Sequence, residues 1–396
     1  MSSINKPMVL IVVGIAVFTD MLIYGMIVPI LPGYVSQLGV SQTAIGFLFA
    51  SYAFALLVAI PIMGVWSDRY GRRAPMLWGL LGLACANLLY CFANGFIMLI
   101  IARVLQGVSA AITWTAGLAL LADVFPDPEE RGKSMGIALS GQAIGTLLGP
   151  AIGGWLYQWQ GYQAPFLFAT LLVLIDGFLR YFYVKDAPHT DIQAEISWRK
   201  IMNIRPLVII SGVTLLGAII PSVLEPTLPI YLHRTLNTSP GVIGLLFGIP
   251  TLAYAFSAPI IGKLSVAWGR IKVMMVGLLI SGVSLTLLTL GHSITSIIMV
   301  LVPLGIGLGL LLAPALSEMA EIADKHDLSY GVVYSIYNTV YSVGMFVGPA
   351  LGGVLAELFG LQVALTIIGS VSVFYLLVLF VKRGSFFPTK KLNLPS

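Results

Sequence analysis

The chain has 396 residues, and only 9% of them are Lys, Arg, Asp or Glu, against roughly 25% in ordinary soluble domains. Hydrophobic residues make up 58% of the sequence, so a soluble protein of this size could not cover its surface with polar groups. This composition excludes a soluble enzyme, a nucleic-acid-binding domain and a disordered chain, since disorder requires low hydrophobicity and high charge. We therefore expect a helical protein that crosses a membrane many times.

Apolar runs of about 20 residues, the length that crosses the hydrocarbon core of a bilayer, recur twelve times along the chain. The predicted spans are 8–31, 43–66, 74–93, 97–122, 134–158, 164–184, 206–232, 241–266, 272–291, 295–322, 329–358 and 361–381. The first run is too long for a cleavable signal peptide and lacks a small-residue cleavage site, so we predict that it is a span. Residues 185–205 interrupt the series. We predict that they link a six-helix bundle over residues 1–184 to a second one over residues 206–396.

The basic residues are distributed unevenly between the two sides of the predicted membrane. Nineteen of the 21 Lys and Arg residues fall on one side, while Arg234 falls on the other side and Arg103 lies within a helix. The positive-inside rule then predicts that both termini and the linker are cytoplasmic. The basic isoelectric point is explained by topology, so no nucleic acid or other acidic partner is needed.

Short segments of the first half of the chain recur in the second half. Ile45-Gly-Phe-Leu-Phe49 returns as Ile243-Gly-Leu-Leu-Phe247. Gly149-Pro-Ala-Ile-Gly-Gly-Trp-Leu156 returns as Gly348-Pro-Ala-Leu-Gly-Gly-Val-Leu355, at nearly the same separation. The repeats indicate two copies of one six-helix unit with the same orientation, since each half has an even number of helices. Transporters built from such parallel repeats bind substrate between the two halves.

Three motifs carry a resemblance to a known family. They are Gly64-Val-Trp-Ser-Asp68-Arg69-Tyr-Gly71-Arg72-Arg73 after the second span, Arg103-Val-Leu-Gln106-Gly107 in the fourth, and Gly145-Thr-Leu-Leu-Gly149-Pro150-Ala-Ile-Gly153-Gly154 in the fifth. With these motifs the chain resembles the twelve-helix drug:proton antiporters of the major facilitator superfamily over its whole length. The resemblance implies an all-helical fold of two six-helix halves and no enzymatic activity. We expect a monomer without cofactor or metal.

Further segments resemble the vesicular amine transporters within that group. They are Glu129-Glu-Arg-Gly132, Met135-Gly-Ile-Ala-Leu139, Ala164-Pro-Phe-Leu167, Leu174-Ile-Asp176-Gly177 and Leu224-Glu225-Pro226-Thr-Leu-Pro229-Ile230. Tyr52, Leu311 and Asn338 stand where that family has a lysine and two aspartates, and residues 32–42 replace its long glycosylated loop. These departures favour a prokaryotic relative in the plasma membrane that exports amines or drugs. In a eukaryote the same protein would lie in a vesicle membrane.

Asp20 is an acid near the midplane of the first predicted span, where an ionisable residue is costly and usually marks a pathway. By resemblance, it occupies the position of the amine-binding aspartate of the vesicular transporters. Burial disfavours the charge of a carboxylate, so Asp20 can hold a proton or an organic cation but not both well, which is the physical basis of antiport. The alternative is a buried, hydrogen-bonded acid with a structural role.

Glu225 is a second intramembrane acid, in the seventh span. Pro226 and Pro229 interrupt the hydrogen-bond ladder of this helix, so its outer end can bend as a gate should. Arg103 lies at a similar depth, and we predict that it forms an ion pair with Glu225 in at least one state. In the alternative, Glu225 is only the structural partner of Arg103. Both residues join Asp20 as predicted proton-coupling residues.

Asp176 and Arg180 are four residues apart in the sixth span, a spacing that brings their side chains together on a helix. We predict a self-neutralised structural pair rather than part of the transport pathway.

Tyrosines at helical spacing mark one face of the eleventh span, with Asn338 next to them. Aromatic faces attract organic cations, so we predict that this face lines the substrate cavity; an interfacial aromatic belt is the alternative. Tyr24 lies one turn from Asp20, and Tyr254 matches a substrate-site tyrosine of the resembling family. The predicted substrate-binding residues are Asp20, Tyr24, Glu225, Tyr254, Tyr334, Tyr337, Asn338 and Tyr341.

Asp68, Arg72 and Asp123 lie at the cytoplasmic ends of the second to fourth spans, with Gly64 and Gly71 allowing close packing and a tight turn. By resemblance, they form a conformational latch in which Asp68 contacts the N-terminus of the eleventh helix in the outward-open state. A carboxylate is favourable at that end of a helix.

The antiporter motif of the fifth span places a glycine at every fourth position. Gly141, Gly145, Gly149 and Gly153 form one stripe, and Pro150 adds a kink. Small residues let helices approach closely, so we predict that this stripe packs the two halves together.

These features predict a proton-coupled exporter of cationic amines or drugs that works by alternating access. Its expected partners are a small organic cation, protons and the lipid bilayer. Two alternatives stay open: coupling to sodium, and export of neutral or anionic compounds, in which Arg103 would face the substrate. A membrane-embedded enzyme is disfavoured, because the sequence has no His-Glu-x-x-His, no Gly-x-Ser-x-Gly and no polar cluster resembling a catalytic dyad.

Overall fold

The computed structural model describes residues 5–184, 203–326 and 328–382. These residues contain twelve helices long and apolar enough to cross a membrane, and no strand. In the first half the helices are α1 (Lys6–Met26), α2 (Leu31–Gln37), α3 (Gln42–Tyr70), α4 (Arg73–Cys91), α5 (Phe96–Val124), α6 (Pro128–Gln160) and α7 (Gln163–Tyr183). In the second half they are α9 (Arg205–Leu236), α10 (Pro240–Trp268), α11 (Arg270–Leu287), α12 (Ile294–Lys325), α13 (Tyr330–Phe359) and α14 (Leu361–Lys382).

The prediction of an all-helical protein with twelve spans is confirmed, with α1 and the short α2 together making the first span. Of the linker predicted over residues 185–205, positions 185–202 lie outside the described residues.

The helix boundaries follow from local chemistry. Ser41 and Ser329 cap the starts of α3 and α13 by accepting a backbone N–H with their side chains, which satisfies donors that a helix start leaves free. Gly71 and Gly269 have φ angles of 86° and 90°, a region that favours glycine. They make the tight turns that join α3 to α4 and α10 to α11, at equivalent places in the two repeats.

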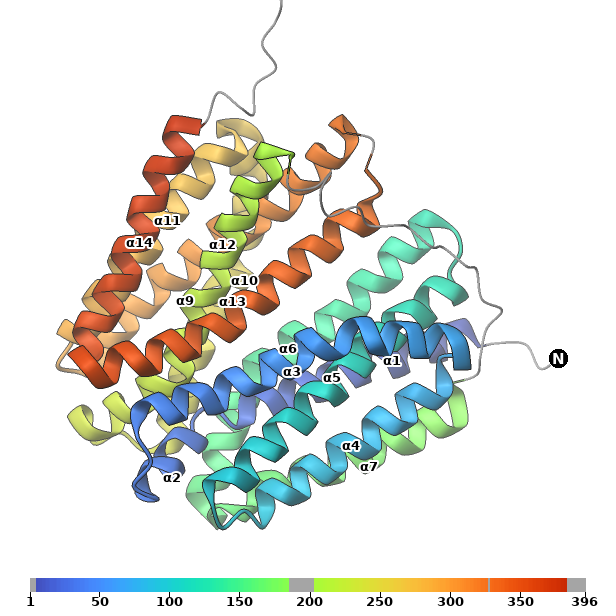
Figure 1. The fold of residues 1–396 in the computed structure, drawn as a ribbon, viewed down its shortest axis with the longest axis horizontal. Helices are drawn as coiled ribbons and strands as arrows, with labels where there is room; N and C mark the ends of the chain where they lie inside the picture. The colour runs from blue at the N-terminus through green and yellow to red at the C-terminus, as the bar shows by residue number, and fades with distance from the viewer. Residues whose placement is uncertain (1–4, 185–202, 327, 383–396) are drawn as a thin grey trace, which may run out of the picture.

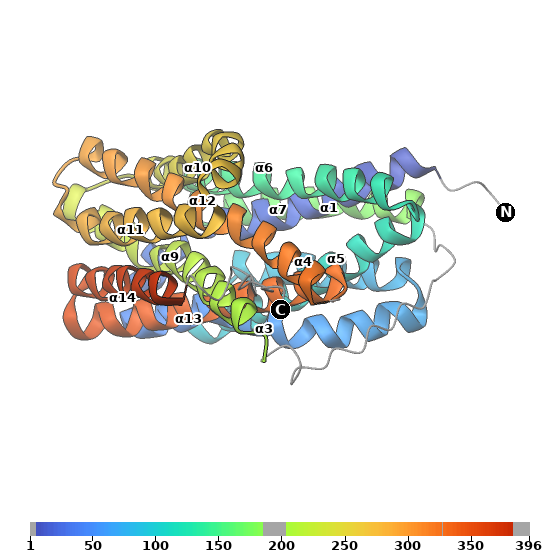
Figure 2. The same ribbon diagram turned by 90° about the horizontal axis from the view of Figure 1, so that it is seen from above.

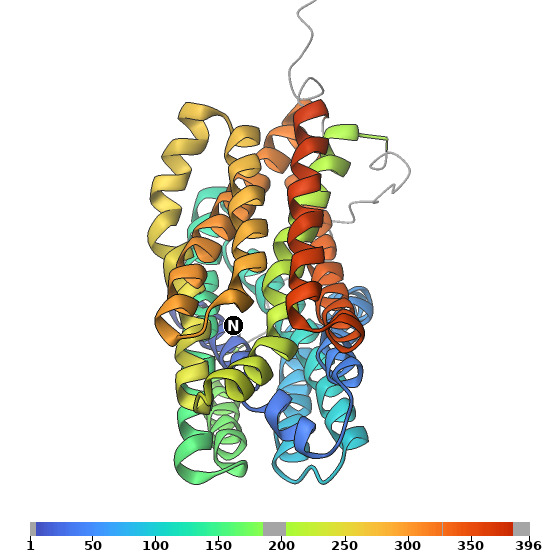
Figure 3. The same ribbon diagram turned by 90° about the vertical axis from the view of Figure 1, so that its left-hand side faces the viewer.

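The molecule consists of two halves, α1–α7 and α9–α14, which contact each other mainly where α3 crosses α13 and α6 crosses α10 (Figures 1 and 2). The start of α1 and the end of α14 lie at the far ends of the two halves, on the side where the halves diverge (Figure 1). We call this side the basic end, because the helix ends there include Lys6, Arg72, Arg131 and Arg270. At the opposite end, α2 lies against α9 (Figure 3). Toward the basic end the two halves diverge (Figure 1).

Backbone contacts between glycines and prolines close the end opposite the basic end. A Cβ atom on Gly46 of α3 would lie 2.4 Å from the Pro349 carbonyl oxygen of α13, and one on Gly244 of α10 would lie 2.0 Å from the Pro150 carbonyl oxygen of α6. Near the basic end, a Cβ atom on Gly64 or on Gly262 would meet nothing within 4 Å. The close packing predicted at Gly64 is therefore not made in this conformation, in which the halves are closed at one end and apart at the other.

The prediction that the glycine stripe of α6 packs the two halves together is wrong. Cβ atoms on Gly141, Gly145 and Gly149 would meet the carbonyl oxygens of Gly14, Phe18 and Leu22 at 2.5–2.6 Å, and Gly153 lies equally close to Met26. All four partners belong to α1, in the same half. The contact with the other half is made by the adjoining face of α6, which presents Pro150 and Gly154. A fixed spacing predicts that one face is small, but it does not say which helix the face meets.

The stripe on α6 gives a test of this packing. Gly149→Ala should lower the free energy of unfolding of the purified protein in detergent by about 1–3 kcal/mol, because the added methyl group would overlap the Leu22 carbonyl oxygen. The melting temperature should fall with it. Gly136→Ala is the matched control on the same helix, since a Cβ atom there would meet nothing within 4 Å. It should leave the melting temperature unchanged or slightly raised, because alanine favours a helix. A melting temperature for Gly149→Ala equal to that of the parent would contradict the assignment.

Candidate functional site

Asp20 of α1 is a buried carboxylate whose two oxygens have different hydrogen bonding. Its side chain is 1% exposed, and the Trp114 indole N–H of α5 donates a hydrogen bond of 3.0 Å to Oδ2. Oδ1 has no hydrogen-bond partner among the residues that the structure describes. A buried carboxylate oxygen without a donor is costly, so Asp20 is a position where a proton or a cationic group would be stabilised.

Glu225 of α9 is bound by a residue from the other half. The Tyr24 hydroxyl of α1 lies 2.7 Å from one Glu225 oxygen and 2.9 Å from the other, so that it donates to this carboxylate. Tyr24 is one helical turn beyond Asp20. Together these contacts place both intramembrane acids around one short segment of α1, and they tie that segment across the interface between the halves.

Arg103 of α5 is completely buried beneath aromatic rings. Its guanidinium carbon lies 4.4 Å from the ring centre of Phe49, 5.4 Å from Tyr24 and 5.7 Å from Tyr52, distances at which a cation is attracted by the ring faces. Its Nη1 also donates to Gln106 Oε1 at 3.2 Å.

In this conformation, the described residues do not form the predicted Arg103–Glu225 ion pair. Tyr24 lies between the two charges, with its ring beside Arg103 and its hydroxyl on Glu225. Equal depth in the membrane brings two residues to one level, but it does not fix the direction in which each helix presents them. A direct pair in another state stays a prediction.

Only part of the tyrosine face of α13 lies near Glu225. The Tyr337 and Tyr341 rings stack with centres 6.2 Å apart, and Tyr341 lies within electrostatic reach of Glu225 and of Tyr254 on α10. Tyr334 is 42% exposed, and Asn338 is exposed as well. The structure therefore brings Tyr341 near Glu225, with Tyr337 and Tyr254 beside Tyr341, and leaves the other two predicted residues at more open positions.

Three aromatic residues of the site were missed as site residues by sequence reasoning. Trp114 holds Asp20, while Phe49 and Tyr52 of α3 cover Arg103, and the Tyr52 ring lies 4.7 Å from that of Tyr24. Phe49 and Tyr52 are three residues apart, so their shared helix face was visible in the sequence. That the face turns toward Arg103 follows only from the packing of α3 against α5.

Asp176 and Arg180 of α7 form the predicted self-neutralised pair. Arg180 donates through Nε to Oδ1 at 3.0 Å and through Nη2 to Oδ2 at 2.6 Å, and the two side chains are 0% and 1% exposed. Its Nη1 also donates to the Met76 carbonyl and the Thr113 hydroxyl, which joins α7 to α4 and α5. These contacts largely satisfy the donors of Arg180 and connect three helices of the N-terminal half.

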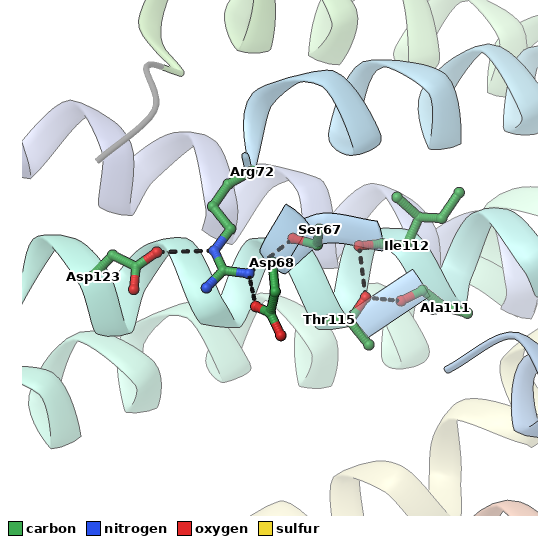
Figure 4. Close-up of polar contacts among 7 residues, drawn as sticks. All are labelled: Ser67, Asp68, Arg72, Ala111, Ile112, Thr115 and Asp123. Atoms are coloured by element: carbon green, nitrogen blue, oxygen red, sulfur yellow. Dashed lines mark hydrogen bonds and ion pairs between the residues drawn. The ribbon is translucent and has the colours of Figure 1, made fainter. Parts of the chain in front are cut away.

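A polar network occupies the basic end of α3, α4 and α5 (Figure 4). Arg72 donates through Nε to Asp123 at 2.9 Å, and through Nη1 to the Ser67 hydroxyl at 3.1 Å and to Asp68. The Asp68 side chain is 65% exposed. The predicted latch residues are thus assembled in this conformation around Arg72, with Asp68 at the open side.

The Major Facilitator Superfamily model matches residues 13–224 and, a second time, residues 210–393. The chain belongs to this superfamily. It is therefore a multi-pass membrane transporter rather than an enzyme, and the twofold match agrees with the sequence repeat. Among the described residues, no group of three or more His, Cys, Asp or Glu side chains could hold a metal ion.

Amine transporters are among the curated relatives. The chain is 32% identical to the chromaffin granule amine transporter of Rattus norvegicus over 335 residues, which is 84% of this chain and 64% of the relative. It is 31% identical to the synaptic vesicular amine transporter of Rattus norvegicus over 86% of this chain and 66% of the relative. The matches thus span slightly less than two thirds of the length of these relatives.

Solved structures share the fold. A bacterial homologue of the human lysosomal transporter Spinster, in an inward-facing and occupied conformation, superposes with a TM-score of 0.79 at 15% identity, over 98% of this chain and 97% of that one. The human organic anion transporter MFSD10 superposes with a TM-score of 0.68 at 18% identity, over 95% of this chain and 100% of that one.

The buried pair in α7 can be tested with a double-mutant cycle. Asp176→Asn or Arg180→Gln alone should lower the free energy of unfolding by about 3–5 kcal/mol, because each leaves an unpaired buried charge. The double variant should lose less than the sum of the two, as measured by thermal or denaturant unfolding in detergent. Glu129 and Lys133 are the matched control, an ion pair of the same spacing on α6 with side chains 79% and 72% exposed. Their cycle should show almost no coupling, and additive losses at Asp176 and Arg180 would argue against the pair.

Proposed function

We propose that this transporter is a proton-coupled antiporter that exports cationic amines or drugs by alternating access. The observation that carries the proposal is the state of Asp20, a fully buried carboxylate with one oxygen held by Trp114 and the other without a described partner. No basic side chain of the described residues is bonded to it. Such a group is stabilised by a proton or by the ammonium group of a substrate, and the two exclude each other.

Glu225 supplies a second exchange site in the opposite half. Its carboxylate accepts from the Tyr24 hydroxyl across the interface, and charge strengthens such a hydrogen bond. Protonation of Glu225 weakens this contact between the halves, while a substrate cation near Tyr341 and Asp20 is attracted by both acids. Proton binding and movement of the halves are in this way coupled through the Glu225 side chain.

The conformation supports a particular direction of opening. The excess of Lys and Arg at the basic end supports assigning that end, with both termini, to the cytoplasm. The halves diverge there and are closed at the other end, which supports an inward-facing conformation (Figure 1). We assign the protein to the plasma membrane as a monomer that receives substrate from the cytoplasm. The amine transporters among the relatives favour an organic cation as substrate.

Export of a neutral or anionic compound is a weaker alternative. It would need Arg103 to face the substrate, yet its side chain is completely buried and three aromatic rings lie over it. Sodium coupling is a separate alternative, which uptake of a labelled amine into proteoliposomes distinguishes when pH and sodium gradients are imposed one at a time. Uptake driven by the sodium gradient alone would overturn proton coupling.

Asp20→Asn should abolish binding of a cationic amine and leave the protein folded, because a neutral side chain costs less to bury than a charged one. In the parent, amine affinity should be highest at high pH, where Asp20 is ionised. It should fall as the carboxylate is protonated, by up to about tenfold per pH unit. The measurement is equilibrium amine binding to purified protein across about pH 5 to 9.

The control for Asp20→Asn is Glu129→Gln, which also neutralises an acid but at a side chain that is 79% exposed on the basic end. It should keep the affinity and pH dependence of the parent. Unchanged affinity in Asp20→Asn, or parent affinity that rises on acidification, would show that Asp20 is not the shared site.

The aromatic face of α13 provides an independent test of cation binding. Tyr337→Phe and Tyr341→Phe should keep most of the amine affinity, since the ring face supplies the attraction, whereas alanine at both positions should weaken binding by about 0.5–2 kcal/mol. Tyr70→Ala, at a tyrosine that is 63% exposed on the basic end of α3, should leave affinity unchanged. A folded double alanine variant that binds as tightly as the parent would remove this face from the site.

A further inference from the structure

Glu357 makes an unusual contact at the end of the molecule opposite the basic end. It lies in the last turn of α13, and its Oε2 accepts a hydrogen bond of 2.7 Å from the backbone N–H of Thr43. Thr43 is the second residue of α3, where a helix leaves its N–H groups without internal acceptors and carries partial positive charge. A carboxylate from one half therefore caps a helix of the other half.

The other crossing of the two halves has an equivalent contact. Gln158 in the last turn of α6 accepts from the backbone N–H of Gly241, the second residue of α10, at 3.3 Å. The repeats that align Gly149–Leu156 with Gly348–Leu355 also align Gln158 with Glu357. The repeat that aligns Ile45 with Ile243 also aligns Thr43 with Gly241. The two contacts are therefore copies of one cap, charged at one crossing and neutral at the other.

The charged copy is also close to the acid assigned to proton exchange. Gln42, the residue before Thr43, donates through Nε2 to the Pro226 carbonyl of α9 at 2.9 Å. Pro226 follows Glu225 directly. The start of α3 is thus held by two helices of the other half, one of them at the residue next to Glu225.

We propose that Glu357 and Gln158 are a pair of latches that hold the outer end closed, each by capping the first turn of a helix in the opposite half. Opening this end removes both caps and exposes helix N–H groups to water. Because Glu357 is charged, its cap is the stronger of the two. This deepens the proposed alternating access and rests on it for the link to transport.

The latches complement the one predicted at the basic end. There Asp68 lies in the last turn of α3 and is predicted to cap the start of α13, while here Glu357 lies in the last turn of α13 and caps the start of α3. The two helices run antiparallel, so each contributes a carboxylate to the other's first turn. At the α6–α10 crossing, the position that repeats Asp68 is Val266, which is 81% exposed and cannot form such a cap. The charged latches thus belong to the α3–α13 crossing.

The test measures how often the outer end opens, using a cysteine that only opening exposes. Ile230 of α9 is 7% exposed and packs into an apolar cluster of the N-terminal half, so Ile230→Cys should react slowly with a neutral maleimide. Cys85 and Cys91 are first replaced by alanine, and the protein is placed in lipid nanodiscs. The labelling rate is then proportional to the open population, even when that population is small.

Glu357→Gln should raise the labelling rate about two- to tenfold, because it converts the charged cap into the neutral copy. Gln158→Glu should lower the rate by a similar factor, because it makes the neutral cap charged. Arg234→Gln is the control, since it changes an exposed charge at the same end without touching either cap. Gel filtration establishes that each variant is folded.

A rate for Glu357→Gln equal to the parent's, or a rate for Gln158→Glu that does not fall, would overturn the latch. The measurement needs neither substrate nor a proton gradient. Its failure would leave amine antiport standing, and loss of the antiport proposal would leave the latch result unchanged.

Discussion

The absence of water in the hydrocarbon core is the constraint on which the rest of this structure depends. Every backbone polar group at that depth must be bonded within a helix, and every ionisable side chain must be compensated individually. Arg180 is neutralised by Asp176, Arg103 is covered by aromatic rings, and Glu225 accepts from a tyrosine hydroxyl. Asp20 keeps Oδ1 without a described hydrogen-bond partner, and Arg103 keeps Nε and Nη2 without one. In the proposed function, this incomplete compensation distinguishes Asp20, as an exchange site, from the fully paired Asp176 and Arg180.

The same constraint shapes the interface between the halves. In the proposed alternating access, two bundles separate and rejoin in a bilayer, and they cannot depend on the hydrophobic effect, because lipid is as apolar as their side chains. Contact is made by close packing and by hydrogen bonds to the free N–H groups at helix starts. Backbone atoms approach closely at Gly46 and Gly244, and Ile230 packs into an apolar cluster of the other half. These contacts are short-ranged and can be replaced by water when an end opens. The stripe within α6 packs on α1 of the same half, so in the proposed alternating access the two helices move together.

Several features of the site depend on distances that no periodicity encodes. Asp20, Glu225 and Arg103 were identifiable from their depth within apolar runs, and the tyrosines of α13 from their spacing. Their partners were not, because Trp114 and Tyr24 meet the acids only through the packing of α1 against α5 and across the two halves. The glycine stripe makes the same point, since its spacing revealed a close helix contact but not that α1 was the partner.

The sequence by itself determined the membrane class, the twelve helices, the repeat and the positions of the buried charges, because span length and the cost of burying charge act locally along the chain. It also determined the Asp176–Arg180 pair, since four residues of one helix fix that distance. The tertiary structure alone decided that Tyr24 stands between Arg103 and Glu225, that the halves close at one end, and that Glu357 caps α3. Each of these depends on how helices rotate about their own axes when they pack, and rotation is set by all neighbours at once.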